Sequence, residues 1–143
     1  MTPDPLALQN QVCFSLAVAA RTVIALYRPI LEPMGLTHPQ YLVMLALWEQ
    51  SPRSVSDLGR ALQLEPATLS PLLKRLEAIG YVTRRRNTAD ERLLDIALTD
   101  SGAALREQAL TVPPQIVERL DVPMDELVAI RDSLTRLIGA ATS

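Results

Sequence analysis

The sequence has only one cysteine and one histidine among its 143 residues. One cysteine forms no disulfide within a chain, and one cysteine with one histidine supplies too few ligands for a zinc site. Neither a glycine-rich phosphate-binding loop nor a nucleophile elbow is present. We therefore expect no metal and no other cofactor, and we expect that the protein is not an enzyme.

Aromatic residues are also scarce, at 3%, whereas hydrophobic residues make up 48% of the chain. Such a composition, rich in leucine, alanine and valine, favours packed helices. The length is that of one domain, which buries about two-thirds of its unfolded surface. The sequence shows no signal peptide and no apolar run of about 18 residues. We therefore expect a cytoplasmic protein with no membrane segment.

Two helices are predicted between Ser54 and Gly80. Ser54 is a suitable N-cap, with the acid Asp57 three residues later, and it starts a short supporting helix. A second helix follows in residues 64–80, with Pro66 in its first turn and Gly80 where a left-handed C-cap is expected. Its apolar residues recur at helical spacing, at Leu69, Leu72, Leu73, Leu76 and Ile79. One face of this helix should be buried, and the other is free to meet a partner.

A basic hairpin is predicted directly after the second helix. Residues 81–86 combine β-branched and aromatic residues with arginines, residues 87–92 are polar, and residues 93–98 alternate in the manner of a strand. Two short helices at a tight turn, followed by such a hairpin, are typical of a winged helix-turn-helix. That fold inserts its second helix into a DNA major groove, and the hairpin tip would lie over the neighbouring minor groove.

Charge is distributed unevenly along the chain. The net charge is −2 and the isoelectric point is about 5.4, which alone argues against a nucleic-acid partner. Between Arg53 and Arg92, however, eight basic residues outnumber five acidic ones, so this part carries +3 and the remainder −5. Phosphate neutralisation acts over a Debye length of roughly 8 Å, so one basic face on an acidic body suits DNA binding. Alternatively, the arginines at 84–86 merely solvate an exposed strand.

The two ends of the chain are predicted to form helices that pair two subunits. Residues 6–31 are apolar on more than one side, which is too wide a surface for the core of so small a chain. Thr37 and Gln40 predict a capping box, and Pro113-Pro114 interrupt the C-terminal helical pattern. The predicted fold is a mostly α single domain (1–143). A winged helix-turn-helix with a small β-hairpin wing (36–99) is flanked by N- and C-terminal dimerisation helices (1–35 and 100–143).

Five segments carry a resemblance to a known family: VCFSL at 12–16, YRPIL at 27–31, LTHPQYL at 36–42, TLSPLLKRLE at 68–77 and DER at 90–92. They resemble the MarR-type winged-helix regulators and, within them, the organic hydroperoxide resistance repressors (OhrR). The resemblance implies a homodimeric repressor that binds a pseudo-palindromic double-stranded DNA operator while its cysteine, Cys13, is reduced. An organic hydroperoxide would oxidise this thiol and so release the operator.

The resemblance assigns redox sensing to Cys13, Tyr27 and His38. A peroxide reacts with the thiolate and gives a sulfenic acid, so Cys13 needs hydrogen-bond donors nearby. Tyr27 matches a family tyrosine but lies 14 residues along the same helix, about 21 Å away, so it would have to come from the other subunit. His38 replaces a second family tyrosine, and it could assist the thiolate or simply face water. With no second cysteine, a low-molecular-weight thiol is expected to cap the oxidised sulfur.

The resemblance also assigns the DNA contacts. The family's Ser-Gly pair in the second helix corresponds to Pro66-Ala67, which leaves Thr68 and Ser70 as the matching polar residues. Arg92, braced by Asp90, is expected to enter a narrow minor groove, with an ordinary exposed ion pair as the alternative. The predicted DNA-binding residues are Ala67, Thr68, Ser70, Lys74, Arg75, Arg84, Arg86, Asp90 and Arg92.

Two other functions remain open at this point. A MarR-type regulator could be released from DNA by a small aromatic or anionic ligand, with Cys13 only packed as a small hydrophobic side chain. A thiol peroxidase or hydrolase that uses Cys13 is a more distant alternative, because the chain has only one histidine and no other catalytic motif.

Overall fold

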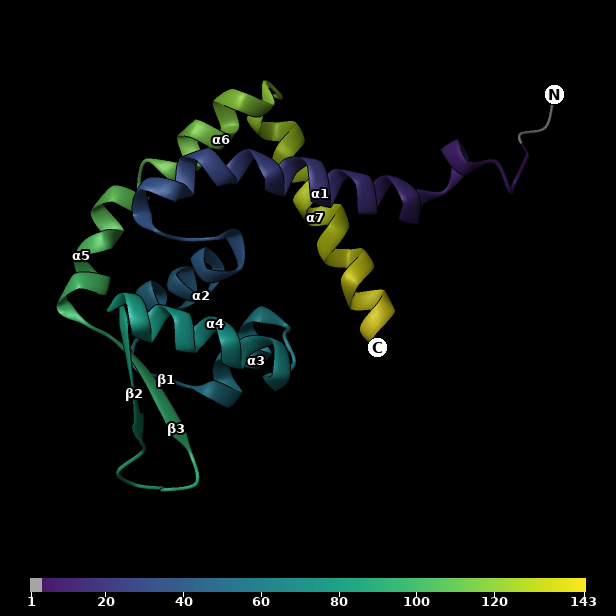
Figure 1. Ribbon diagram of the computed structural model, residues 1–143. Coiled ribbons are helices and arrows are strands. Elements are labelled where there is room, and N and C mark those ends of the chain that lie inside the picture. Colours follow the sequence, from purple (N-terminus) through teal and green to yellow (C-terminus); the bar gives the residue numbers. More distant parts are fainter. Residues whose placement is uncertain (1–3) are drawn as a thin grey trace.

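The structure is a computed structural model, which describes residues 4–143 and is mostly helical (Figure 1). Its helices are α1 (Val12–Leu31), α2 (His38–Glu49), α3 (Val55–Leu62), α4 (Pro66–Ile79), α5 (Asp100–Ala109), α6 (Val112–Leu120) and α7 (Met124–Thr142). Two short 3-10 helices, η1 (Leu8–Asn10) and η2 (Glu32–Met34), precede and follow α1. The strands are β1 (Arg53–Ser54), β2 (Val82–Arg86) and β3 (Leu94–Leu98).

The predicted winged helix-turn-helix is confirmed, and its ends lie where local signals predict them. The hydroxyl of Ser54 accepts a hydrogen bond from the main-chain N–H of Asp57 at 3.1 Å and so caps α3. Pro66 is the first residue of α4, where its missing N–H leaves no hydrogen bond unmade. Gly80 ends the helix at a φ of +102°, a conformation that favours glycine.

The wing is a three-stranded antiparallel sheet with the strand order β1-β3-β2. Val82 pairs with Leu98 and Arg86 with Leu94, which confirms the predicted hairpin. Strand β1 adds Arg53 opposite Ile96 and was not predicted, because two residues are too few to produce an alternating pattern. Strand β1, by pairing with β3 directly before α3, anchors the base of the wing beside α3.

The hydrophobic core lies where α2, α3 and α4 meet the C-terminal end of α1 and the sheet. Its most deeply buried side chains include Leu31, Val43, Met44, Leu47, Leu58, Leu69, Leu76, Val82 and Ile96. Ile79 is 46% exposed, so the buried stripe predicted for α4 is one residue shorter than expected. The side chain of Arg53 is only 12% exposed and bonds Asp57 and the carbonyl of Ala46, so this arginine is a structural residue rather than part of a basic face.

Two terminal helices begin at residues other than those predicted. α1 begins at Val12 rather than residue 6, because the Gln11 backbone is extended and its side chain donates to the carbonyls of Pro5 and Ala7. Pro113-Pro114 do not interrupt a helix: the break between α5 and α6 lies at residues 110–111, and α6 begins at Val112 with both prolines in its first turn, where proline is tolerated.

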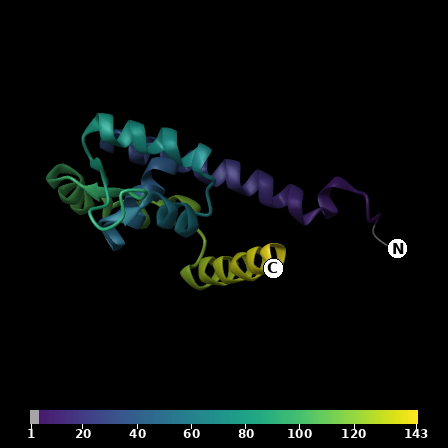
Figure 2. The same cartoon turned by 90° about the horizontal axis from the view of Figure 1, so that it is seen from below.

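The first and last helices leave much apolar surface uncovered. Of the residues of α7, all of which the structure describes, none is buried, and in α1 only Ile30 and Leu31 are. Figures 1 and 2 show both helices extending away from the winged helix-turn-helix. Large apolar side chains on these helices and on the segment before α1 are 40–88% exposed: Leu6, Leu8, Val12, Phe14, Ile24, Met124, Ile130, Leu137 and Ile138.

The segment Val12–Met34 is long and apolar enough to cross a membrane by length and composition, with a mean hydropathy of 1.4. The expectation that no such run exists is therefore wrong. The segment nevertheless carries Arg21 and Arg28, both exposed, and charged side chains are costly in hydrocarbon.

Gly102 is a position where any side chain would collide with the backbone. A Cβ there would meet the carbonyl oxygen of Tyr81 and approach Leu98 Cδ2 at 3.3 Å. We expect Gly102→Ala to lower the free energy of unfolding by about 2 kcal/mol or more, as measured by urea denaturation. Ser101→Ala, at an exposed position next to Gly102, is the control and should change the free energy of unfolding by less than about 0.5 kcal/mol. Equal stabilities for the two variants would contradict the close packing of α5 on the wing.

Candidate DNA interface and thiol site

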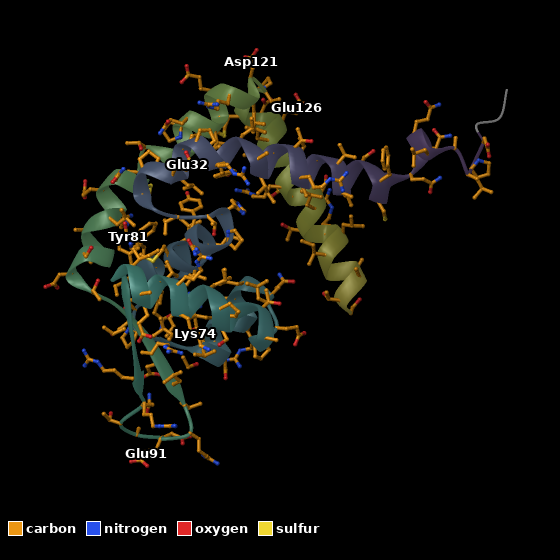
Figure 3. The ribbon with its side chains drawn as sticks, in the orientation of Figure 1. Glu32, Lys74, Tyr81, Glu91, Asp121 and Glu126 are labelled. Carbon is orange, nitrogen blue, oxygen red and sulfur yellow. The ribbon has the colours of Figure 1, made fainter. Side chains whose placement is uncertain are left out.

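The predicted contact residues of α4 lie on its exposed face. Leu69, Leu73 and Leu76 are buried, Leu72 is partly buried against the core, and the predicted contact residues are exposed. These exposed residues are Ala67, Thr68, Ser70, Lys74 and Arg75. Figure 3 labels Lys74 on α4 and Glu91 at the tip of the wing. Both the exposed face of α4 and the wing are therefore accessible to one extended partner.

Two of the predicted wing contacts already have partners within the chain. Arg84 pairs with Glu77 of α4, with its Nη2 3.0 Å from the carboxylate oxygen Oε1. Arg86 donates through Nη1 to the carbonyl of Glu91 at 2.9 Å. Arg84 thus braces the wing against α4, and Arg86 shapes its tip. Arg85, on the opposite face of the strand, is exposed.

The wing tip holds Arg92 outward. Its side chain is 90% exposed, and Asp90 accepts hydrogen bonds from its Nε at 3.1 Å and its Nη2 at 3.2 Å. These bonds, together with that from the main-chain N–H of Arg92, hold the pKa of Asp90 below its usual value. The Asn87 side chain in turn accepts from the N–H groups of Ala89 and Asp90. The tip therefore presents a preorganised guanidinium to solvent.

Cys13 is an exposed free thiol in the first turn of α1. α1 runs without a break to Leu31, so Tyr27 lies about 21 Å along the same helix from Cys13. The structure therefore does not bring the three predicted redox-sensing residues together within one chain.

Tyr27 and His38, in contrast, are in direct contact. Their ring centroids are 4.7 Å apart in an edge-on arrangement with an interplanar angle of 63°. Tyr41 joins them, 5.9 Å from Tyr27 and 6.4 Å from His38. Tyr41 was not predicted as a site residue, although its position three residues after His38 places both on one face of α2. We call these three residues the aromatic cluster.

Burial sets the ionisation of the aromatic cluster. It lowers the pKa of His38 below 6.5 and raises the pKa of Tyr27 above 10.0. The pKa of Tyr41 is also raised, first by burial and then by the neighbouring Tyr27. Near neutral pH the cluster is therefore uncharged and can offer N–H and O–H donors.

A cavity of about 450 Å³ opens beside the aromatic cluster, between α1 and the start of α2. Ile24, Ala25 and Leu36 give it an apolar lining, and Arg21, Arg28 and Glu32 give it charged groups of both signs. Its size and lining suit a small organic molecule.

Comparison with known proteins identifies the family. Residues 36–94 match the MarR family. The organic hydroperoxide resistance transcriptional regulator of Bacillus subtilis (strain 168) is 38% identical over 135 residues, which cover 94% of this chain and 92% of that protein. The regulator TtmR of Methylorubrum extorquens (strain PA1) is 42% identical over 134 residues, covering 94% of this chain and 69% of that protein. The chain belongs to the MarR family of winged-helix transcription regulators.

The structure agrees with this assignment. The DNA-bound structure of reduced AbfR matches it with a TM-score of 0.78 at 38% identity and covers 95% of each chain. The family resemblance inferred from the sequence is confirmed. The protein is a transcription regulator and not an enzyme, as the sequence also predicted.

We expect Arg92→Ala to weaken DNA binding by about tenfold or more, because a guanidinium in the minor groove interacts with concentrated negative potential. The probe is a fluorescent duplex selected by the reduced protein from a random-sequence library, and binding is followed by anisotropy. The melting temperature should stay unchanged, since the Asp90 pair is exposed. Arg119→Ala changes an exposed residue of α6, a helix that lies far from the wing (Figure 1); this variant is the control and should bind as wild type. An Arg92→Ala affinity equal to that of the control would contradict the role of the wing tip.

Proposed function

We propose that this protein is a homodimeric repressor that binds a pseudo-palindromic operator and releases it when an organic hydroperoxide oxidises Cys13. The observation that carries the proposal is the arrangement of α1. An exposed thiol lies near one end of this helix, and the Tyr27–His38 pair, with a cavity beside it, lies near the other. The similarity to an organic hydroperoxide resistance regulator over 94% of the chain supports this reading.

The dimer is supported by the uncovered apolar surface of the terminal helices. A monomer in water would leave side chains such as Met124, Ile130 and Leu137 about half exposed on α7. A groove between α1 and α7, lined by Leu16, Leu134 and other apolar residues, adds to this surface. Pairing these helices across a two-fold axis would remove the apolar area from water. Burial of α1 in this dimer contact would also explain why a helix of a cytoplasmic protein is apolar along so much of its length.

The dimer also completes the thiol site. In an antiparallel arrangement of two α1 helices, Cys13 of one subunit approaches the aromatic cluster of the other. Tyr27 and His38, both uncharged near pH 7, then donate hydrogen bonds that favour the thiolate over the thiol. The cavity beside His38 has room for the organic group of the peroxide.

The reaction forms one S–O bond and breaks one O–O bond. The Cys13 thiolate attacks one peroxide oxygen, the O–O bond breaks, and the departing alkoxide takes a proton to become an alcohol. The sulfur is left as a sulfenic acid. A low-molecular-weight thiol then condenses with it, giving a mixed disulfide and water. AbfR, a structural relative from Staphylococcus epidermidis, has been solved in reduced, overoxidized and disulfide-formed states.

DNA binding uses α4 and the wing. The exposed face of α4 enters the major groove, where Thr68 and Ser70 reach base edges or phosphates and Lys74 and Arg75 contact the backbone. Ala67 brings the helix close to the groove, and Arg92 enters the minor groove. Arg84 and Arg86 act chiefly by holding the wing in place through their internal bonds. A two-fold dimer presents two such units to a pseudo-palindromic site.

The central test is the response of Cys13→Ser to oxidation. We measure the affinity for the selected duplex before and after a small excess of cumene hydroperoxide with a low-molecular-weight thiol. Wild type should lose affinity by at least about tenfold, whereas Cys13→Ser should stay within about twofold, because its hydroxyl cannot be oxidised. Release by both proteins, or by neither, would contradict the sensor role of Cys13.

A further inference from the structure

The hydroxyl of Tyr81 makes a hydrogen bond between two parts of the molecule that carry different functions. It donates to the main-chain carbonyl of Met34, 47 residues earlier, at 2.6 Å. Met34 ends η2, the turn between α1 and α2, and Tyr81 precedes the first residue of β2. Figure 3 labels Tyr81 at the root of the wing and Glu32 in the turn. The bond therefore joins the turn beside the aromatic cluster to the strand that enters the wing.

The wing end of this bond is held firmly. The N–H of Tyr81 donates to the carbonyl of Leu76 at 3.0 Å, and its carbonyl accepts from the N–H of Thr99 at 3.0 Å. The Thr99 hydroxyl donates to the carbonyl of Gly80 at 2.6 Å. Val82, the next residue, is 1% exposed. A displacement of Tyr81 must therefore displace the root of both long wing strands.

The turn end is equally constrained. Met34 is 2% exposed and Leu36 5% exposed. Thr37 and Gln40 form a reciprocal capping box, in which each side chain bonds the main-chain N–H of the other residue. His38 is the first residue of α2. Only three residues separate Met34 from His38, and two of them are tied back to the preceding helix: the N–H of Gly35 donates to the carbonyl of Glu32 at 2.9 Å, and that of Leu36 to the carbonyl of Leu31 at 3.3 Å.

We propose that Tyr81 is a positioning residue that couples the thiol site to the wing. The inference rests on the proposed function, since it concerns how the state of Cys13 reaches the DNA-binding surface. A mixed disulfide on the partner's Cys13 is bulkier than a thiol, so it displaces His38 and the turn that begins α2. The Tyr81 bond carries this shift to β2 and hence to Arg92 at the wing tip. In the reduced protein, the same bond fixes the wing in its DNA-binding position.

A purely stabilising role for Tyr81 predicts something different. In that case, loss of the hydroxyl would lower the unfolding stability and leave the ratio of the oxidised to the reduced dissociation constant unchanged. A coupling role predicts that the ratio itself falls, although Cys13 is oxidised at the wild-type rate. This ratio therefore separates the two roles.

The test uses Tyr81→Phe, which keeps the ring and removes one oxygen atom. Dissociation constants for the selected duplex are measured on the reduced protein and after cumene hydroperoxide with a low-molecular-weight thiol, and Cys13 oxidation is followed by mass spectrometry. The ratio of the oxidised to the reduced dissociation constant should fall by about fivefold to tenfold relative to wild type. This change corresponds to the free energy of about one hydrogen bond. Amide hydrogen exchange of the reduced protein should become about fivefold to tenfold faster at Val82 and Thr83.

Trp48→Phe is the matched control. It removes another aromatic donor, whose Nε1 bonds the carbonyl of Gly102 at 2.9 Å, across 54 residues, and ties α2 to α5 rather than to the turn. Its oxidised-to-reduced ratio should stay within about threefold of wild type.

Two results would overturn the inference. The first is that Tyr81→Phe gives the same oxidised-to-reduced ratio of dissociation constants as wild type, although wild type itself loses DNA after peroxide treatment. The other is unchanged exchange at Val82 and Thr83, whatever the redox result. If oxidised wild type keeps its DNA, the proposed function fails instead. In that case, hydrogen exchange at Val82 and Thr83 is the remaining test of whether Tyr81 holds the wing in place.

Discussion

The rigid length of α1 is the constraint on which the proposed sensor depends. A continuous helix holds Cys13 about 21 Å from Tyr27, and no side-chain rotation closes that distance. Tyr27 is itself held against His38, with the ring centroids 4.7 Å apart. In the proposed sensor, each chain carries two halves of a site at opposite ends of one helix. Two antiparallel copies would bring unlike halves together, and one two-fold axis would complete two sites.

In the proposed dimer, the same axis would link sensing to DNA recognition. The terminal helices expose apolar surface that a second subunit can cover, and the winged helix-turn-helix lies to one side of them (Figure 1). Because the half-sites of a palindrome are one helical turn apart or a multiple of it, a small change in wing placement is enough to weaken both contacts. The aromatic cluster lies one short turn away from the Tyr81 bond, so a local change there has a direct route to the wing.

Local signals allowed most of the fold to be predicted from the sequence. The caps at Ser54 and Thr37 depend on residues three positions apart, and both form as expected. The two-residue strand β1 left no periodic signal. The ion pair of Arg84 with Glu77 depends on how the wing folds back on α4, which the sequence does not show. Arg84 was therefore predicted to contact DNA. Tyr41 was not predicted as a member of the aromatic cluster, because its contact with Tyr27 depends on how α1 packs against α2.

The most direct test of the shared thiol site is a mixed dimer, purified through two different affinity tags. One subunit carries Cys13→Ser with Tyr27 and His38 intact, and the other keeps Cys13 but carries Tyr27→Phe and His38→Phe. The measurement is the rate at which the one remaining thiol reacts with cumene hydroperoxide, compared with wild type and with the Tyr27→Phe, His38→Phe homodimer. A site shared between subunits predicts the wild-type rate, because the thiol meets the intact aromatic cluster of its partner. A rate equal to that of the slow homodimer would contradict it.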